Sequence, residues 1–308
     1  MKTIMFPGQG SQKAGMASEF HSNFKIVRDI FEKVDDALKF NLSKIILDGS
    51  NEELKKTEIT QPAILTTSFA IFSVLKQEFN FDLSRVKYIA GHSLGEYSAL
   101  VASGSLSLED SVTLVHERGK LMQEAVPEGK GAMLAVMGLD VNELNTLLNK
   151  FNDKNGTCEI ANDNSLGQII LSGNKESLIS FSNNLKLEKK RCIFLPVSAP
   201  FHCSLMKPAA EKMKLFLQKT EFKNTTLKII SNVTALPVKK DEDIKDLLYK
   251  QIFSQVRWRE TVEYMIKNDI NDFIEIGPGK VLSGLVKRTN DKVLTRSLTK
   301  IEDIKNLQ

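Results

Sequence analysis

The feature that most constrains the fold of this 308-residue chain is the alternation of short apolar runs with longer stretches of helical periodicity. Strands that alternate with helices predict a mainly parallel sheet covered by helices on both faces, the α/β class. The spacing predicts strands over Thr3–Phe6, Val86–Ala90, Leu227–Ser231, Phe273–Ile276 and Val293–Leu298, with main helices over Phe20–Leu38, Pro62–Phe79 and Ser107–Val126.

The order of elements changes between Gly131 and Val197, where the pattern becomes strand, helix, strand, strand, helix, strand. The expected strands are Ala132–Met137, Cys158–Ala161, Gln168–Ser172 and Cys192–Val197, with helices from about Val141 and over Lys175–Leu187. A βαββαβ order is typical of a small ferredoxin-like module. We therefore predict a large subdomain over residues 1–129 and 198–308, with a small subdomain inserted at residues 130–197.

Composition excludes several classes of protein. Lys and Arg number 42 against 38 Asp and Glu, and a net charge of +4 is too balanced for a protein that coats nucleic acid. The longest apolar stretch, Ala63–Leu75, is interrupted by Thr and Ser and is shorter than the ~20 residues of a membrane span. The three cysteines form no CxxC pair, which argues against a disulfide framework or a zinc site and favours the reducing cytoplasm.

The segment Gly91-His92-Ser93-Leu94-Gly95 joins a predicted strand to a predicted helix. G-x-S-x-G in this context is the nucleophile-elbow pattern, in which glycines permit a sharp turn that exposes the serine. Negative charge that develops near Ser93 would meet backbone N–H groups and the positive end of the helix dipole. The alternative is an ordinary strand-to-helix turn that contains the string by chance.

A nucleophilic serine needs a base, and the chain has four histidines. Helical periodicity places His21 and His116 on solvent faces, and His92, next to Ser93, is expected to pack or to hydrogen-bond locally. His202 lies in a loop that follows a predicted strand and is bracketed by prolines, a position that favours functional residues. His202 is therefore the preferred base, and its alternative role is that of a structural histidine.

Arg118 is the one charged residue within the apolar arc of the predicted helix Ser107–Val126. A buried guanidinium keeps its charge and needs a carboxylate or several acceptors nearby. Two interpretations remain open from the residues alone. Arg118 either forms a structural salt bridge with an internal Asp or Glu, which is the more common case, or binds the carboxylate of a ligand bidentately.

Two glycine-rich turns follow predicted strands. Pro7-Gly8-Gln9-Gly10-Ser11-Gln12 fits neither G-x-G-x-x-G nor the phosphate-binding G-x-x-x-x-G-K-[ST], so phosphate binding is not supported. Such a loop at a sheet edge can instead donate a backbone N–H to an oxyanion. The second turn, Gly277-Pro278-Gly279, is expected to be architectural.

Six segments taken together closely resemble the malonyl-CoA:acyl carrier protein transacylases. They are FPGQGSQ, TQPAIL, GHSLGEYSAL, ERGKLMQEAVPEGKGAM, PFHCSLMKPAA and EIGPGKVLSGL, in this order over nearly the whole chain. The resemblance implies an α/β-hydrolase-like parallel-sheet body with a ferredoxin-like insert. It also implies a cytoplasmic acyltransferase of type II fatty-acid synthesis whose partners are malonyl-CoA and acyl carrier protein.

The resemblance also implies roles for individual residues. Ser93 would be the acylated nucleophile, His202 its general base and then acid, and Arg118 the malonate-binding residue, which reverses the preference stated above. Neither a metal nor a redox cofactor is implied. The further implied residues are Gln9 and Leu94 as backbone oxyanion donors, Gln251 as the carbonyl that orients the histidine, Asn162 as a cleft residue of the small subdomain, and Phe201 as a bulky residue that disfavours branched acyl groups.

The implied mechanism is ping-pong, with malonyl-Ser93 as the intermediate and the phosphopantetheine thiol of acyl carrier protein as the second substrate. A serine hydrolase or thioesterase is a rival within the same chemistry, and it would pass the acyl group to water. A non-catalytic subunit that binds acyl carrier protein is a rival of a different class, and it would not need Ser93.

Overall fold

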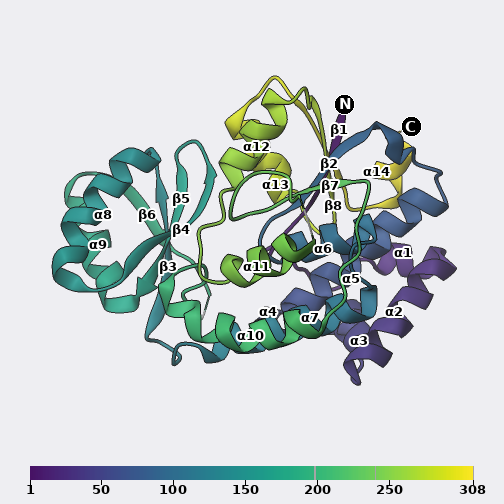
Figure 1. Ribbon diagram of the computed structural model, residues 1–308, viewed down its shortest axis with the longest axis horizontal. Coiled ribbons are helices and arrows are strands. Elements are labelled where there is room, and N and C mark those ends of the chain that lie inside the picture. The colour runs from purple at the N-terminus through teal and green to yellow at the C-terminus, as the bar shows by residue number, and fades with distance from the viewer. Residues whose placement is uncertain (198, 240, 308) are drawn as a thin grey trace.

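The computed structural model describes residues 1–197, 199–239 and 241–307, which form a large α/β body and a smaller sheet-and-helix unit beside it (Figure 1). The body contains a five-stranded sheet in the order β7-β2-β1-β8-β9, and all its neighbouring strands are parallel. The strands are β1 (Lys2–Phe6), β2 (Val86–Gly91), β7 (Lys228–Ile230), β8 (Asp272–Ile276) and β9 (Leu294–Leu298). Each of the five strands predicted for the body is confirmed.

Helices cover both faces of this sheet, because successive side chains of a buried strand point to opposite sides. Ile4 and Phe6 of β1 pack into one apolar cluster, whereas Met5 between them packs into another with Trp258. The body helices are α1 (Ser18–Asn23), α2 (Lys25–Leu38), α3 (Leu42–Asp48), α4 (Asn51–Lys55), α5 (Thr57–Gln77), α6 (Leu94–Ser103), α7 (Leu108–Glu124), α10 (Lys207–Lys219), α11 (Asp241–Gln251), α12 (Trp258–Lys267), α13 (Val281–Thr289) and α14 (Ile301–Lys305), with 3₁₀ turns η1 (Leu83–Arg85) and η2 (Ser204–Met206).

Two of the predicted helices differ from the structure. The stretch predicted as one helix, 20–38, is two helices, because Phe24 adopts an extended conformation between α1 and α2. The helix predicted to begin at Pro62 begins at Thr57 instead. Pro62 has no N–H to donate to the carbonyl of Glu58 one turn earlier, and the Nδ1–H of His116 on α7 donates to that carbonyl at 2.9 Å.

Among the described residues, α5 is the only helix with the length and the apolar composition that a membrane span requires. However, 83% of its most apolar window is buried inside the protein. Its neighbours α2, α6 and α7 pack around it. The apolar composition of α5 is therefore that of a central core helix.

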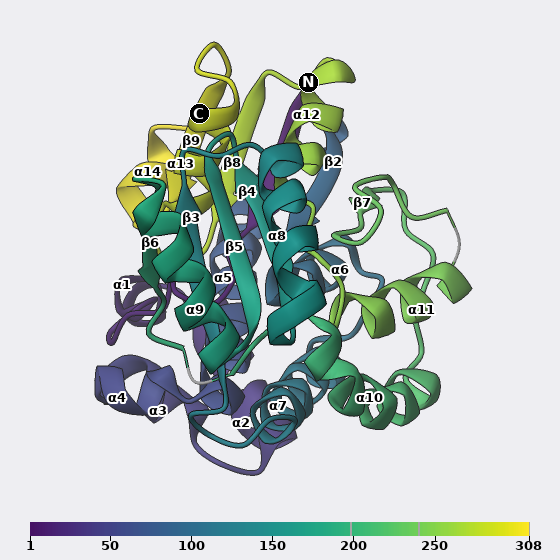
Figure 2. The same ribbon diagram turned by 90° about the vertical axis from the view of Figure 1, so that its left-hand side faces the viewer.

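The small unit, whose helices α8 and α9 lie nearest the viewer in Figure 2, contains an antiparallel sheet in the order β4-β5-β3-β6. Its elements are β3 (Gly131–Met137), α8 (Val141–Asn155), β4 (Cys158–Ser165), β5 (Gln168–Asn174), α9 (Lys175–Leu187) and β6 (Arg191–Phe194). The βαββαβ order is confirmed, and the strand order is that of a ferredoxin-like sheet. The subdomain boundaries at 129/130 and 197/198 stay a prediction, and residue 198 lies outside the described residues.

Strand β4 joins the small unit to the body at the segment before α12. The Asp163 N–H donates to the Val256 carbonyl at 3.0 Å, and the Val256 N–H donates to the Ala161 carbonyl at 2.8 Å. The carboxylate of Asp163 lies 2.8 Å from the Arg259 guanidinium of α12 and is 1% exposed. An ion pair whose carboxylate is buried thus reinforces a short backbone pairing between the two units.

Candidate active site

Ser93 lies on a sharp turn between β2 and α6 and has the strained backbone angles φ 54° and ψ −111°. The turn depends on its two glycines, because a Cβ at Gly91 would lie 1.9 Å from the Gly95 carbonyl, and a Cβ at Gly95 would lie 2.2 Å from the Phe6 carbonyl. No side chain larger than hydrogen fits at either position. The strand-turn-helix geometry expected of a nucleophile elbow is therefore present.

Asn232, which follows β7, holds this turn in place. Its Oδ1 accepts the Ser93 N–H at 2.6 Å, and its Nδ2 donates to the Gly91 carbonyl at 2.7 Å. The side chain is completely buried. The Ser93 N–H donates to Asn232 and is not available to a ligand. The next amide at the start of α6 is the Leu94 N–H, which has no carbonyl partner within the helix.

Ser93 and His202 form a hydrogen-bonded pair with 2.8 Å between Oγ and Nε2. The other ring nitrogen, Nδ1, donates to the Gln251 carbonyl at 2.8 Å, which fixes the tautomer and leaves Nε2 as the acceptor. Burial, together with the charge of Arg118, lowers the pKa of His202 to about 3. The ring is therefore neutral at physiological pH and can accept the Ser93 proton.

Arg118 lies inside the protein with 2% exposure and reaches the same serine. Its Nη1 donates to Gln61 Oε1 at 2.7 Å, and its Nη2 donates to Gln251 Oε1 at 2.8 Å and to Ser93 Oγ at 3.1 Å. Within the described part of the chain Arg118 forms no salt bridge, and its Nε has no hydrogen-bond partner. This geometry argues against a structural salt bridge and leaves the guanidinium available for a ligand carboxylate.

The roles of the remaining predicted residues, Gln9, Asn162 and Phe201, stay predictions. The loop that carries Gln9 contacts the elbow, because a Cβ on the adjacent Gly8 would lie 2.6 Å from the His92 carbonyl. Asn162 lies on β4 at the bridge to Val256 and is 5% exposed. Phe201 is buried beside His202 in the chain.

The other histidines have structural contacts. His92 Nε2 lies 2.9 Å from Asn164 Oδ1 of the small unit, and its ring packs against Trp258. The expected packing and hydrogen bonding of His92 are confirmed, but both partners are distant in sequence. The predicted solvent positions of His21 and His116 are wrong, because both rings are half-buried. His21 packs against Phe31, and His116 packs against Phe40.

The sequence reasoning missed four residues of this network, namely Gln61, Glu96, Asn164 and Asn232. The sequence contains a signal for Asn232, which follows a predicted strand, because polar residues just after parallel strands gather at one edge of the sheet. Glu96 also had one, since it is the only charged residue of α6. Gln61 and Asn164 carry no such signal.

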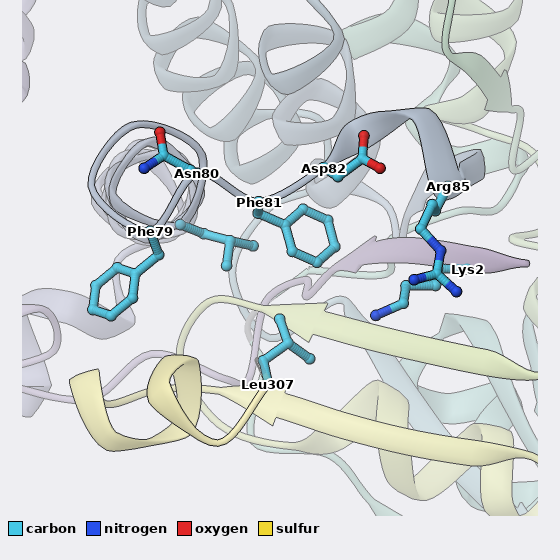
Figure 3. Close-up of a pocket in the computed structure, with 8 residues that line it drawn as sticks. Lys2, Phe79, Asn80, Phe81, Asp82, Arg85 and Leu307 are labelled. Carbon is cyan, nitrogen blue, oxygen red and sulfur yellow. The ribbon is translucent and has the colours of Figure 1, made fainter.

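A separate hollow of about 260 Å³ lies away from Ser93 (Figure 3). Lys2, at the beginning of β1, lines it, whereas the loop beside Ser93 follows the other end of that strand. The other lining residues come from the end of α5, the segment up to Arg85, and Leu307. This hollow is therefore not part of the Ser93 site.

A parallel sheet that carries a serine on an elbow, paired with a neutral histidine, defines the class of enzymes that form acyl-serine intermediates. Residues 3–306 match the family described as acyl transferase domain. A malonyl CoA-acyl carrier protein transacylase of Bacillus subtilis is 43% identical over 98% of this chain and 94% of its own length. The chain thus belongs to the acyl transferase family, among the malonyl CoA-acyl carrier protein transacylases.

Solved structures agree with this assignment. The crystal structure of an acyl-carrier-protein S-malonyltransferase from Bartonella henselae superposes with a TM-score of 0.96, with 40% identity over 99% of this chain and 98% of that one. A structure of a type II PKS acyl-carrier protein in complex with its malonyl-transacylase has a TM-score of 0.94, with 38% identity over 99% and 98% of the two chains.

Proposed function

We propose that this protein transfers the malonyl group from malonyl-CoA to the phosphopantetheine thiol of acyl carrier protein through malonyl-Ser93. The observation that carries the proposal is the buried Arg118, which contacts the nucleophile and amide oxygens but no carboxylate of the described chain. A guanidinium in this position matches an acyl group that ends in a carboxylate. An acetyl group offers no such partner.

In the first half-reaction the malonyl carboxylate docks on Arg118, and Ser93 Oγ attacks the thioester carbon. The Ser93 proton passes to His202 Nε2, and the backbone N–H groups of Gln9 and Leu94 stabilise the oxyanion. The C–S bond then breaks, and His202 returns the proton to the CoA thiolate. The fixed tautomer leaves Nε2 of neutral His202 free to accept the first proton, and the lowered pKa of His202 favours the return of that proton.

In the second half-reaction the thiol of acyl carrier protein gives its proton to His202 and attacks malonyl-Ser93. The C–O bond to Ser93 breaks, and Oγ recovers the proton from His202. Asn162 contributes to the wall of the cleft on the side of the small subdomain. Phe201 limits the space for a branched acyl group.

We further propose that the enzyme works in the cytoplasm. Cys158, Cys192 and Cys203 are all free thiols in the structure, as is usual in reducing compartments. To test this location, cells of the source are fractionated, and the activity should be found in the cytoplasmic fraction.

Intact-mass measurement tests the proposed reaction. After mixing with malonyl-CoA, the wild-type protein should gain the mass of one malonyl group, keep it in buffer, and lose it when acyl carrier protein is added. Ser93→Ala should gain nothing. Rapid loss of the group to water would instead identify a hydrolase, and wild-type function of Ser93→Ala in cells would identify a non-catalytic carrier-binding subunit.

A further inference from the structure

Glu96, in the first turn of α6, is a buried carboxylate that the proposed mechanism does not use. It is 2% exposed. Its Oε2 accepts the Asn232 N–H at 3.1 Å and the Gln251 Nε2–H at 2.8 Å. Burying an ionised carboxylate costs free energy unless an opposite charge compensates for it. The burial of Glu96 next to the catalytic network therefore needs an explanation.

Gln251 connects Glu96 to the groups that act on substrate. Its Nε2 donates to Glu96 and to the Ser93 carbonyl, so its Oε1 must face the Arg118 guanidinium, which donates to it at 2.8 Å. Its backbone carbonyl orients His202. Glu96 thereby fixes the orientation of an amide that contacts Arg118 on one side and supports the histidine on the other.

We propose that Glu96 is the counter-charge of Arg118 and that Glu96 takes up a proton when an acyl carboxylate docks on Arg118. This inference rests on the proposed function of the site. When Glu96 is ionised in the free enzyme, its negative charge balances the Arg118 cation within one buried network. A malonyl carboxylate would add a second negative charge, and protonation of Glu96 restores the balance in a region where charges interact strongly.

The surroundings of Glu96 are suited to this exchange. Burial raises the pKa of its carboxyl group to about 7, against the opposing effects of the Asn232, Gln251 and Ser231 hydrogen bonds and the Arg118 charge. Other elements packed around α6 contribute neutral groups, namely the Gln61 amide of α5 and the Gly91 carbonyl of β2.

The nearby titratable groups stay in one state near pH 7. Burial raises the pKa of Tyr97, beside Glu96 on α6, to about 12, and burial lowers that of His202 to about 3. Burial also lowers the pKa of His92. A pH response of malonyl selection near neutrality can therefore be assigned to Glu96.

The proton of this exchange comes from solvent and is separate from the reaction protons. The Ser93 proton leaves with CoA as its thiol whether the acyl group is malonyl or acetyl. Acetyl-CoA is therefore the matched substrate, because it has the same leaving group and no acyl carboxylate. The ratio of kcat/KM for the two substrates removes titrations of CoA and of His202.

The first experiment measures acylation of Ser93 by malonyl-CoA and acetyl-CoA at about pH 6 and about pH 8. In the wild type, we expect the malonyl-to-acetyl ratio to fall about tenfold at the higher pH, because ionised Glu96 opposes the incoming carboxylate. Glu96→Gln, which keeps an acceptor for Gln251, should abolish this fall. Glu275→Gln, which neutralises a buried carboxylate that accepts N–H groups of α13, should keep it.

The second experiment needs no variant. Wild-type protein in weak buffer near pH 7 is mixed with each acyl-CoA, and a pH indicator reports protons taken up for each acyl-Ser93 formed. Malonyl-CoA should give uptake of a substantial fraction of a proton per site, and acetyl-CoA should give none. Equal uptake for both substrates, or a Glu96→Gln ratio that still falls with pH, would overturn the inference. Failure to form malonyl-Ser93 would instead overturn the proposed function.

Discussion

At the scale of single residues, Arg118 differs from most buried arginines in having amide oxygens and a hydroxyl as partners. Its Nε is buried without a partner, and its charge is held at the nucleophile. This arrangement stabilises the free protein less than an ion pair would, because no carboxylate offsets desolvation directly. The same arrangement would give the carboxylate of the proposed substrate a strong and specific partner.

Arg118→Ala should therefore lower acylation of Ser93 by malonyl-CoA roughly 10- to 150-fold more than acylation by acetyl-CoA. The range corresponds to the ~1.5–3 kcal/mol of a hydrogen bond to a charged group. Rapid-quench measurement with both acyl-CoA substrates gives the two rates. Lys120→Ala, an exposed change on the same helix, is the control. An equal loss for the two substrates would contradict carboxylate docking.

Residues whose position depends on local sequence were predictable, and those whose position depends on the tertiary fold were not. Ser93 could be predicted from five residues between a strand and a helix, and Arg118 from its place in an apolar helical arc. The prediction that His21 and His116 face solvent was wrong, because Phe31 packs against His21 and Phe40 packs against His116 from other segments. Asn232 and Ser93 are 139 residues apart in sequence, and the position of Asn232 after a strand indicates the edge of the sheet but not this partner.

At the scale of elements, the elbow is set by contact between backbones. The start of α6 lies so close to the end of β1 that Gly95 touches the Phe6 carbonyl. Gly284 is also a helical glycine, in α13, but a Cβ there would meet no atom within 4 Å. Comparing alanine at these two positions separates the helix propensity of alanine from the steric clash that its Cβ causes at Gly95.

We expect Gly95→Ala to destabilise the protein by about 2 kcal/mol or more, because strain of this kind costs ~1–3 kcal/mol, and to abolish acylation of Ser93. Gly284→Ala should retain acylation and change stability by up to ~1 kcal/mol in the favourable direction. Urea unfolding and intact mass after mixing with malonyl-CoA give both quantities. Normal acylation by Gly95→Ala would show that the elbow tolerates a wider turn.

Strands were predicted more accurately than helix ends, for a physical reason. The central strands are buried on both faces, so their apolar runs are continuous and bounded by turns. Helix α5 is buried almost all round, and its first turn is polar, so the apolar run marks only its middle. Proline is favoured at helix starts, but Pro62 lies inside α5, and the donor that compensates for its missing N–H belongs to another helix.

At the scale of the whole molecule, the two units meet through β4. Asp163 of β4 is buried against Arg259 of α12, and Asn164 contacts His92 of the elbow. The small unit therefore contacts α12 and the elbow through adjacent residues of one strand. The order of elements predicted two units, but the residues of their contact could not be predicted without the packing.

Arg259→Ala should lower the free energy of unfolding by about 3–5 kcal/mol, because it leaves the Asp163 carboxylate buried without its partner. Urea denaturation at neutral pH gives this value. Lys25→Ala removes an exposed ion pair with Asp29 and should cost no more than ~0.5 kcal/mol. If the two variants unfold at the same urea concentration, the Asp163–Arg259 pair does not stabilise the contact.

The contact between His116 of α7 and α5, the helix that contains Pro62, bears on where Arg118 lies. Three neighbouring residues of α7 meet α5 in succession: His116 bonds the Glu58 carbonyl, Arg118 bonds Gln61, and Gly119 lies against the Thr57 backbone. Together they fix the axial register of the two helices, and the depth of the guanidinium beneath the serine follows from that register. Under the role proposed for Arg118, the missing N–H of Pro62 thus contributes to the position at which an acyl carboxylate would dock.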